Sequence, residues 1–515
     1  MKHPNSNSHR VSRAVAWTVF AALAVVVLGA VLWRAGMTRS WVQALSTIGG
    51  GQVPRPITLR VWDWWSPSGN EEYGYYFEDL ERAFEAQNAD IDVVYQIVPF
   101  GNYVQKLSTA MVGRTPPDVF QSSVYWAEGF FHRGMLRSLN GLIDIDGGTG
   151  PTRVAKDAFL PSAWRHNHAP NGDVFGIPQI IDAQCLVWNL DILEKAAESD
   201  GQIRAMFMRR ADGSLDTNRI RYDAVRDWEH FRAICRKLTK RGPDGEFLQS
   251  GFVIHAYGGG AGMFSPWLAA NGGRYQDEAG RTAHFNSPRG AQAMSFLAGL
   301  YWQDRVCPPF VRQLSEVGLF EEGKVAAVVA GTWSGKDIMR DTLGWSHFGK
   351  TAFPPGPSGE GHKTVTWGNM LVITRRCEQV AAAWRYVKFV CSLEGNLLRL
   401  KHLGYNGPRL DFYNTPQWAA KVQTRPYLSN VKQICLVGDK LRHTEIIAVN
   451  HQANPIIETI LLRYPSLVAG EGPYKSVQAA LDVAADHVNN VYDRYNRQVR
   501  AWSTRKASVR HASER

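Results

Sequence analysis

The sequence predicts an α/β protein built from two lobes, and two observations lead to this fold class. Strand-like and helix-like stretches alternate after residue 56. The runs ITLRVW (57–62) and IDVVYQIV (91–98) are typical of strands, whereas YFEDLERAFEAQN (76–88) and YVQKLSTAMV (103–112) place apolar residues at helical spacing. The chain has 515 residues and is 44% hydrophobic. It therefore exceeds the size of roughly 250–300 residues at which one core usually divides into domains.

The N-terminus predicts a membrane anchor. Residues 14–33 form an uninterrupted apolar stretch of about the length that spans a bilayer as a helix. Lys2, Arg10 and Arg13 precede it, which favours a cytoplasmic segment at 1–13 and an exported remainder. An uncleaved signal anchor is favoured over a cleaved signal peptide, because Trp33 and Arg34 stand where small residues would mark a cleavage site. Residues 34–56, rich in glycine and proline, are expected to be a linker.

The first predicted strand ends in an unusual group of tryptophans. Trp62 closes the strand, and Trp64 and Trp65 follow it, before the turn residues of 66–69. Ligands of open α/β sheets bind beyond the carboxyl ends of the strands. We therefore expect Trp62 to anchor the strand in its lobe and Trp64 and Trp65 to extend toward a ligand.

Several kinds of chemistry are disfavoured by the sequence. The six cysteines show no CxxC spacing and no histidines at metal-ligand spacing, so neither a metal nor another cofactor is expected. GTWSGKD (331–337) is one residue too short for a phosphate-binding loop, and no nucleophile elbow or zinc-protease motif is present. The net charge of +11 is scattered and has no aromatic-basic motif with it, which argues against nucleic-acid binding. His166 and His168 are expected to lie in an exposed loop.

Two stretches carry a family resemblance. GRTPPDVFQSSVYWAEGFFHRGMLRSLNGLI (113–143) and NGDVFGIPQIIDAQCLVWNLDILEKA (171–196) resemble the extracellular solute-binding proteins of family 1, the carbohydrate-binding components of ABC importers. Looser matches follow in order at 227–239, 267–275, 285–301, 320–333, 353–359 and 381–396.

The resemblance implies a type II periplasmic-binding-protein fold, with two lobes joined by strand-crossover hinges. One lobe would comprise 57–181 and 371–408, and the other 182–370 and 409–500, before a basic tail at 501–515. The solute would bind in the cleft between the lobes, and hinge closure would enclose it.

The resemblance also suggests which residues bind the solute. A pyranose offers a C–H face to aromatic rings and hydroxyl groups to carboxylates and amides, so such a site needs both kinds of side chain. Carried over position by position, the candidates are Asp63, Trp64 and Trp65 after the first strand; Ser122, Ser123, Tyr125 and Trp126 after the Pro-Asp strand; the hinge carboxylate Asp182; Trp267; Trp333; Trp367 and Asn369; and Tyr405 and Asn406.

The expected function is non-catalytic. The protein would bind an oligosaccharide or glycoside, as a monomer, and deliver it to ABC permease subunits from the periplasmic face of the inner membrane. Tyr125 and Trp126 replace charged or amide groups of maltodextrin-type members, so maltodextrin is a poor candidate ligand. A polyamine, iron or a phosphorylated polyol in the same fold is an alternative, with Tyr125 and Tyr405 the obvious tyrosine pair for iron. A glycosidase using Asp63 and Asp182 is a more remote one.

The C-terminal region is predicted to form an amphipathic helix. In SVQAALDVAADHVNNVYDRYNRQV (476–499) the apolar stripe contains Val477, Leu481, Ala484, Val488 and Val491. The basic residues beyond 501 are expected either to be disordered or to be attracted to an anionic membrane surface.

Overall fold

The computed structural model describes residues 56–513, except 66–70, 170, 255–258, 278–280, 309–319, 321, 333–346 and 441–445. The predicted cytoplasmic segment, the membrane anchor and the linker up to residue 55 lie outside these described residues. Across the part of the chain that is described, no helix is both long and apolar enough to cross a bilayer.

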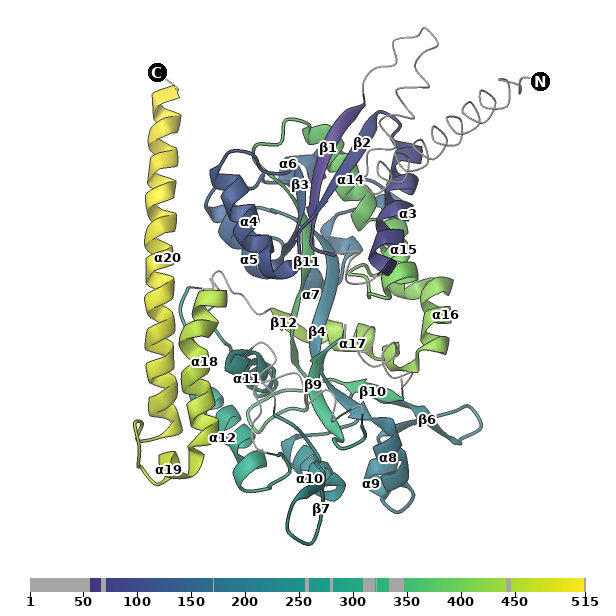
Figure 1. The fold of residues 1–515 in the computed structure, drawn as a ribbon, viewed down its shortest axis with the longest axis vertical. Helices are drawn as coiled ribbons and strands as arrows, with labels where there is room; N and C mark the ends of the chain where they lie inside the picture. Colours follow the sequence, from purple (N-terminus) through teal and green to yellow (C-terminus); the bar gives the residue numbers. More distant parts are fainter. Residues whose placement is uncertain are drawn as a thin grey trace, which may run out of the picture. The chain divides into compact units, whose positions relative to one another are not determined.

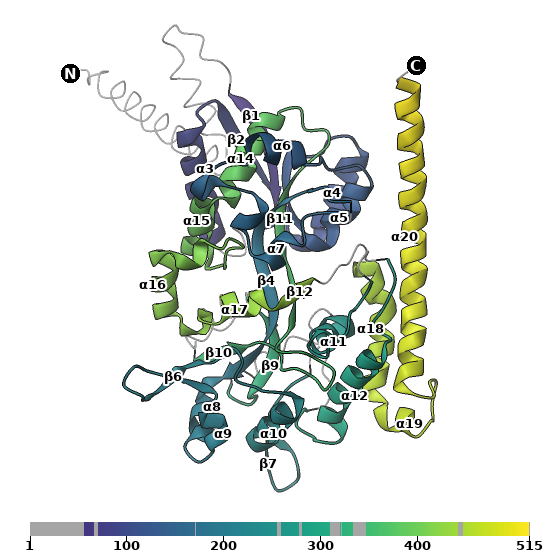
Figure 2. The same ribbon diagram turned by 180° about the vertical axis from the view of Figure 1, so that it is seen from behind.

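Strands and helices alternate in the first part of the described chain, as predicted. The elements are β1 (Ile57–Asp63), α3 (Glu71–Gln87), β2 (Ile91–Ile97), α4 (Phe100–Val112), β3 (Val119–Ser123) and α5 (Val124–His132). The helical spacing of Phe77, Leu80 and Phe84 is confirmed, because all three side chains of α3 are buried. β1 and β3 pair in parallel. Helices α4 and α5 lie on one side of these strands, and α3 lies on the other (Figures 1 and 2).

The middle of the chain contributes short elements and two long strands. The elements up to the second long strand are α6 (Asn140–Asp146), η1 (Gly150–Thr152), η2 (Lys156–Ala158), α7 (Pro161–Trp164), β4 (Ile177–Asn189), α8 (Leu190–Ala197), α9 (Gly201–Arg204), β5 (Phe207–Arg209), β6 (Leu215–Ile220), α10 (Trp228–Leu238), β7 (Lys240–Arg241), β8 (Phe247–Gln249), α11 (Gly259–Ala270), α12 (Pro288–Trp302), β9 (Ala327–Gly331), β10 (Phe348–Thr351) and β11 (Thr364–Ile373). The long strands are β4 and β11.

The two long strands change partners along their length. The main sheet has the order β10-β4-β11-β3-β1-β2, with β9 beside β4 and β12 (Gly438–Lys440) beside β11. The first half of β4 pairs antiparallel with β11, and its second half pairs with β9 and β10. β11 in turn pairs with β12 near its start and with β3 near its end. Both strands therefore connect one group of strands to the other, which confirms the α/β prediction.

Helices dominate the C-terminal part. They are α14 (Val380–Cys391), α15 (Leu393–Leu403), η3 (Phe412–Asn414), α16 (Pro416–Thr424), η4 (Pro426–Leu428), α17 (Val431–Leu436), α18 (Ile446–Leu462), α19 (Tyr464–Val468) and α20 (Val477–Ser513). The predicted apolar stripe of α20 is buried in one core together with residues of α11, α12 and α18. α20 continues to Ser513, so residues 501–513 are helical rather than disordered. A helix that is already nucleated extends readily through alanine, arginine and lysine.

Two of the apolar cores bear on the site. Trp62 belongs to a core with Tyr103, Leu107 and Phe120, on the α4 and α5 side of β1 and β3. The prediction that Trp62 anchors its strand is therefore confirmed. A larger core lies around α10, α11 and α12 and contains Trp267, which has no exposed surface.

Candidate functional site

The loop after β1 is shaped by the buried carboxyl group of Asp63. Its Oδ1 accepts hydrogen bonds from the backbone N–H groups of Trp64, at 2.7 Å, and Trp65, at 3.0 Å. Burial raises the pKa of Asp63 to about 7, although the two backbone hydrogen bonds and the charge of Arg399 act in the opposite direction. Asp63 thus turns the chain so that the two tryptophans leave the strand in a fixed conformation.

Trp65 brings two distant segments together through ring stacking. Its indole lies nearly parallel to the rings of Tyr73 and Tyr405, with centroid distances of 6.1 Å and 5.5 Å. Tyr405 follows α15, whose C-cap residue Gly404 adopts the left-handed conformation that glycine tolerates. Trp65 itself is buried, whereas both tyrosines are half-buried. The tyrosines therefore offer more surface to a ligand than the tryptophan that supports them.

Trp64 belongs to a second aromatic group, which we call the aromatic cluster: Trp64, Phe100 and Trp126, supported by Tyr103. Trp64 makes edge-to-face contacts with Phe100 at 5.7 Å and Trp126 at 5.6 Å, and Phe100 lies 5.6 Å from Trp126. The single hydroxyl hydrogen of the buried Tyr103 is shared between the carbonyls of Trp62, at 3.1 Å, and Gln121, at 2.9 Å. The cluster is thereby tied to β1 and β3, while the Phe100 side chain is 60% exposed.

Phe100 was missed at the sequence level. It opens α4 directly after β2 and Pro99, so it also follows the carboxyl end of a strand. The reasoning that singled out Trp64 applies equally to Phe100.

Four of the candidate residues share one face of the sheet. Ser123 of β3 pairs with Asn369 of β11, and Trp367 of β11 pairs with Asp182 of β4. Directly opposed residues point to the same face, and so do residues two apart on a strand. Ser123, Asn369, Trp367 and Asp182 therefore line one strip of the sheet where β4 and β11 exchange partners. Ser122 points to the opposite face and donates to the carbonyl of Ser123.

A buried polar network surrounds Asp182. Its Oδ1 accepts from the hydroxyl of Thr332 at 2.9 Å, and Lys350 Nζ donates to the carbonyl of Thr332 at 2.7 Å. Burial lowers the pKa of Lys350 to about 8, partly offset by Cys185 and Asp182. Asn406, also buried, donates from Nδ2 to the carbonyl of Ile181 at 2.5 Å. Asn406 thus fixes the backbone beside Asp182. Thr332 and Lys350 belong to the network around Asp182, although neither was among the residues predicted from the sequence.

The remaining candidates fall elsewhere. Trp267 packs against Phe231, Phe252 and Phe353, with ring centroids 5.0–6.1 Å away. Because none of its surface is exposed, we assign it to the core and not to the site. Trp333 lies outside the described residues, and Tyr125 is in the first turn of α5 with a side chain that is not described.

The expectation of an exposed loop at His166 and His168 is wrong for His166. This side chain is buried, with Nε2 3.1 Å from the hydroxyl of Thr366 in β11. His168 is half-buried, and its Nδ1 donates to the carbonyl of Trp164 at 3.1 Å. The polar residues around His166 in the sequence suggested an exposed loop, but this loop packs against the long strand β11.

Comparison with protein families identifies the fold. The model of the bacterial extracellular solute-binding proteins matches residues 66–396. The chain belongs to this family. The solute-binding protein therefore has the α/β periplasmic-binding-protein fold, acts outside the cytoplasm, and binds a solute rather than catalysing a reaction. A Brucella abortus (strain 2308) relative, named as a binding protein, is 22% identical over 326 residues, which cover 62% of this chain and 68% of the relative.

Solved structures agree with this fold. The GacH receptor of Streptomyces glaucescens, studied unliganded and with acarbose, is 20% identical, covers 85% of this chain and 98% of its own, and has a TM-score of 0.59. The cyclic α-maltosyl-1,6-maltose binding protein of Arthrobacter globiformis is 19% identical, with coverages of 85% and 100% and a TM-score of 0.65. The sugar-binding protein MalE of Xanthomonas citri is 20% identical, with coverages of 85% and 98% and a TM-score of 0.65. At these identities the likeness establishes the fold of the solute-binding protein and not its ligand.

Proposed function

We propose that this solute-binding protein is the substrate-binding component of an ABC importer and that its ligand is a carbohydrate, an oligosaccharide or glycoside. The ligand binds between a lobe formed by 57–181 and 371–408 and a lobe formed by 182–370 and 409–500. The exchange of strand partners along β4 and β11, close to both lobe boundaries, supports this division.

The aromatic cluster is the observation that carries the proposal. Trp64 follows the end of β1, Phe100 opens α4 after β2, and Trp126 lies in α5 directly after β3. All three residues remain at least partly exposed. Packed apolar rings that remain partly exposed suit the C–H face of a pyranose.

Polar groups for the sugar hydroxyls come from the neighbouring sheet. Ser123 and Asn369 are opposed across β3 and β11, and Asp182 is opposed to Trp367 two residues further along β11. A carboxylate accepts from hydroxyls in charge-assisted hydrogen bonds, and an amide both donates and accepts. The strip therefore combines the hydrogen-bonding groups that a sugar needs beside an aromatic surface.

The ligand class is tested by a thermal-shift screen of the full chain with mono- and oligosaccharides, spermidine and ferric citrate. A ligand that binds the folded state alone raises the Tm once its concentration exceeds the Kd. We expect a rise with one class of sugar and no consumption of that sugar. A rise in Tm only with spermidine or only with ferric citrate would mean that the ligand is a polyamine or iron and not a carbohydrate.

The site is tested by Phe100→Ala. The loss of this ring should weaken sugar binding at least fivefold, about 1 kcal/mol. The Tm should change little, because the side chain is mostly exposed and contributes little to the core. Tyr75→Ala is the matched control, since Tyr75 is a 52% exposed aromatic residue on α3. Equal sugar affinities of wild type and Phe100→Ala, measured by calorimetry, would show that the aromatic cluster does not bind the sugar.

A further inference from the structure

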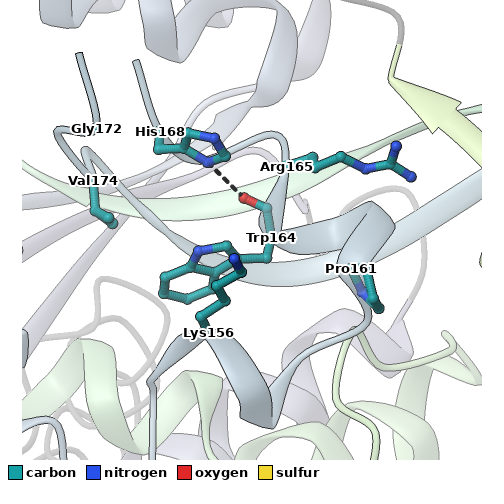
Figure 3. Close-up of a pocket in the computed structure, with 7 residues that line it drawn as sticks. All are labelled: Lys156, Pro161, Trp164, Arg165, His168, Gly172 and Val174. Atoms are coloured by element: carbon teal, nitrogen blue, oxygen red, sulfur yellow. Dashed lines mark hydrogen bonds between the residues drawn. The ribbon is translucent and has the colours of Figure 1, made fainter. Parts of the chain in front are cut away.

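A pocket of about 590 Å³ lies beside α7 and shares no lining residue with the proposed site (Figure 3). Lys156 of η2 and Pro161 and Trp164 of α7 form one part of it. The hairpin in which His168 and Val174 face each other forms another part, and Arg165 extends away from the indole. None of these residues belongs to the aromatic cluster or to the strip around Asp182.

The floor of this pocket is supported by ring stacking and by a buried arginine. The indole of Trp164 stacks on Phe159 at 5.5 Å, and the guanidinium of the buried Arg409 lies 5.6 Å from the Phe159 ring. Arg409 in turn makes a two-pronged ion pair with Asp411, at 2.8 and 2.7 Å. A preformed apolar floor of this kind reduces the ordering that a ligand must impose on binding.

The polar groups around this floor are all basic. Lys156 and Arg165 carry positive charge, His168 adds an imidazole, and none of the described lining residues is acidic. The nearest carboxylates in sequence have partners outside the pocket, because Asp157 pairs with Arg153 and Asp173 accepts from Ser138. The potential in the pocket therefore favours an anion.

We propose that this pocket binds a small ligand with a planar apolar body and one anionic group, a carboxylate or a phosphate. The body lies against Trp164, Pro161 and Val174, and the anionic group is held by Lys156, with Arg165 adding to the positive potential. This site is separate from the sugar site.

The segment that contains the pocket contacts β11 and the start of β4, the two long strands of the proposed site, and also β12. Arg165 Nη2 donates to the carbonyl of Gly438 in β12 at 3.0 Å, and His166 contacts Thr366 of β11. Asn167 Nδ2 donates to the carbonyl of Gly176, next to β4, at 2.9 Å. Thr366 directly precedes Trp367, which pairs with Asp182. An anion held by Lys156 changes the electrostatic environment of Arg165, which supports β12, and we expect this change to alter solute affinity, a consequence that rests on the proposed function.

Binding is tested by calorimetry on the full chain with phenyl phosphate, benzoate and neutral benzyl alcohol. We expect phenyl phosphate or benzoate to bind and benzyl alcohol to bind at least tenfold more weakly; comparing the two anions distinguishes phosphate from carboxylate recognition. Lys156→Gln should lower the affinity for the anion at least tenfold. Lys156 is exposed on a short η helix, so this change spares the fold, and Lys195→Gln on the exposed face of α8 is the matched control.

Three results would overturn the site: no binding of either anion, equal binding of benzyl alcohol, or unchanged affinity in Lys156→Gln. Coupling is measured separately, by determining solute affinity with and without phenyl phosphate. We expect phenyl phosphate to change the solute affinity of the wild type at least threefold and to leave that of Lys156→Gln unchanged. An unchanged solute affinity would refute the coupling. If no sugar binds at all, the proposed function fails while the anion titration still decides the pocket.

Discussion

The buried carboxyl group of Asp63 fixes the backbone of the loop after β1, although burial disfavours its charged form. The carboxyl accepts two backbone hydrogen bonds that set the course of Trp64 and Trp65. Its removal from water disfavours the charged form by more than these bonds and the Arg399 charge favour it. The residue therefore holds a proton in the folded protein at pH values where an exposed aspartate has lost it.

This protonation makes stability depend on pH in a definite direction. The pKa is raised from 3.8 to about 7, so between these values the folded state binds more protons than the unfolded state. The contribution of Asp63 to stability is present at low pH and is lost as pH rises through about 7. The loss is on the order of 4 kcal/mol when each pKa unit is taken as 1.36 kcal/mol.

Asp63→Asn should remove this dependence. The amide oxygen still accepts from both backbone N–H groups but does not ionise, so the variant should gain stability relative to wild type at pH 8 and not at pH 4. Urea unfolding at the two pH values measures the difference, and the exposed Asp244→Asn is the control. A parallel change of stability with pH in wild type and variant would show that folding does not raise the pKa of Asp63.

At the scale of elements, β4 and β11 bring together side chains from three separate parts of the chain. The pairing of Asn369 with Ser123 and of Trp367 with Asp182 depends on the register of these strands, and a β-bulge follows at Asn369 and Met370. A slip by one residue would turn each side chain to the opposite face. The strip of polar residues is therefore a property of the sheet rather than of any single loop.

The docking of α20 is a second feature at this scale. Leu481 is buried, Asp482 accepts from the Asn286 amide, and Tyr492 donates its hydroxyl to Gln276 at 2.6 Å. The first half of this helix is thus part of the core around α11, α12 and α18 (Figure 1).

Leu481→Ala should accordingly destabilise the fold by about 2–5 kcal/mol, because it removes apolar contacts and leaves a cavity. Val468→Ala on neighbouring α19 is the control, since Val468 is 67% exposed and should change stability by less than about 0.5 kcal/mol. Urea unfolding gives both values. Similar small losses in the two variants would mean that α20 is not integral to the core.

At the scale of the whole molecule, the family assignment places the solute-binding region outside the cytoplasm. The apolar stretch at 14–33 is predicted to anchor the protein in the membrane, which would hold it beside the permease of the proposed function. We retain the uncleaved anchor as a prediction.

Intact-mass measurement of the protein purified from membranes checks this prediction. The expected mature chain still contains Ala14 to Trp33, since Trp33 and Arg34 are poor cleavage-site residues. Release of the protein by salt alone, together with a mature start near Gly36, would show a cleaved signal peptide instead.

The sequence by itself determined the fold class and the family, and it predicted most segments of the proposed site. Alternating periodicities and turn residues are local properties, so they predicted α3, β2, α4 and the buried stripe of α20. They also predicted that Trp64 and Trp126 follow the carboxyl ends of strands, because the end of a strand can be recognised from the local sequence.

Only the tertiary structure decided which side chains meet. Phe100 joins the aromatic cluster, Thr332 and Lys350 surround Asp182, and Trp267 belongs to a core. His166 is buried against β11, contrary to its polar surroundings in the sequence. Burial and hydrogen bonding depend on contacts between separate segments of the chain, such as His166 with Thr366 and Asp182 with Thr332, and no local pattern contains the strand register and packing that create those contacts.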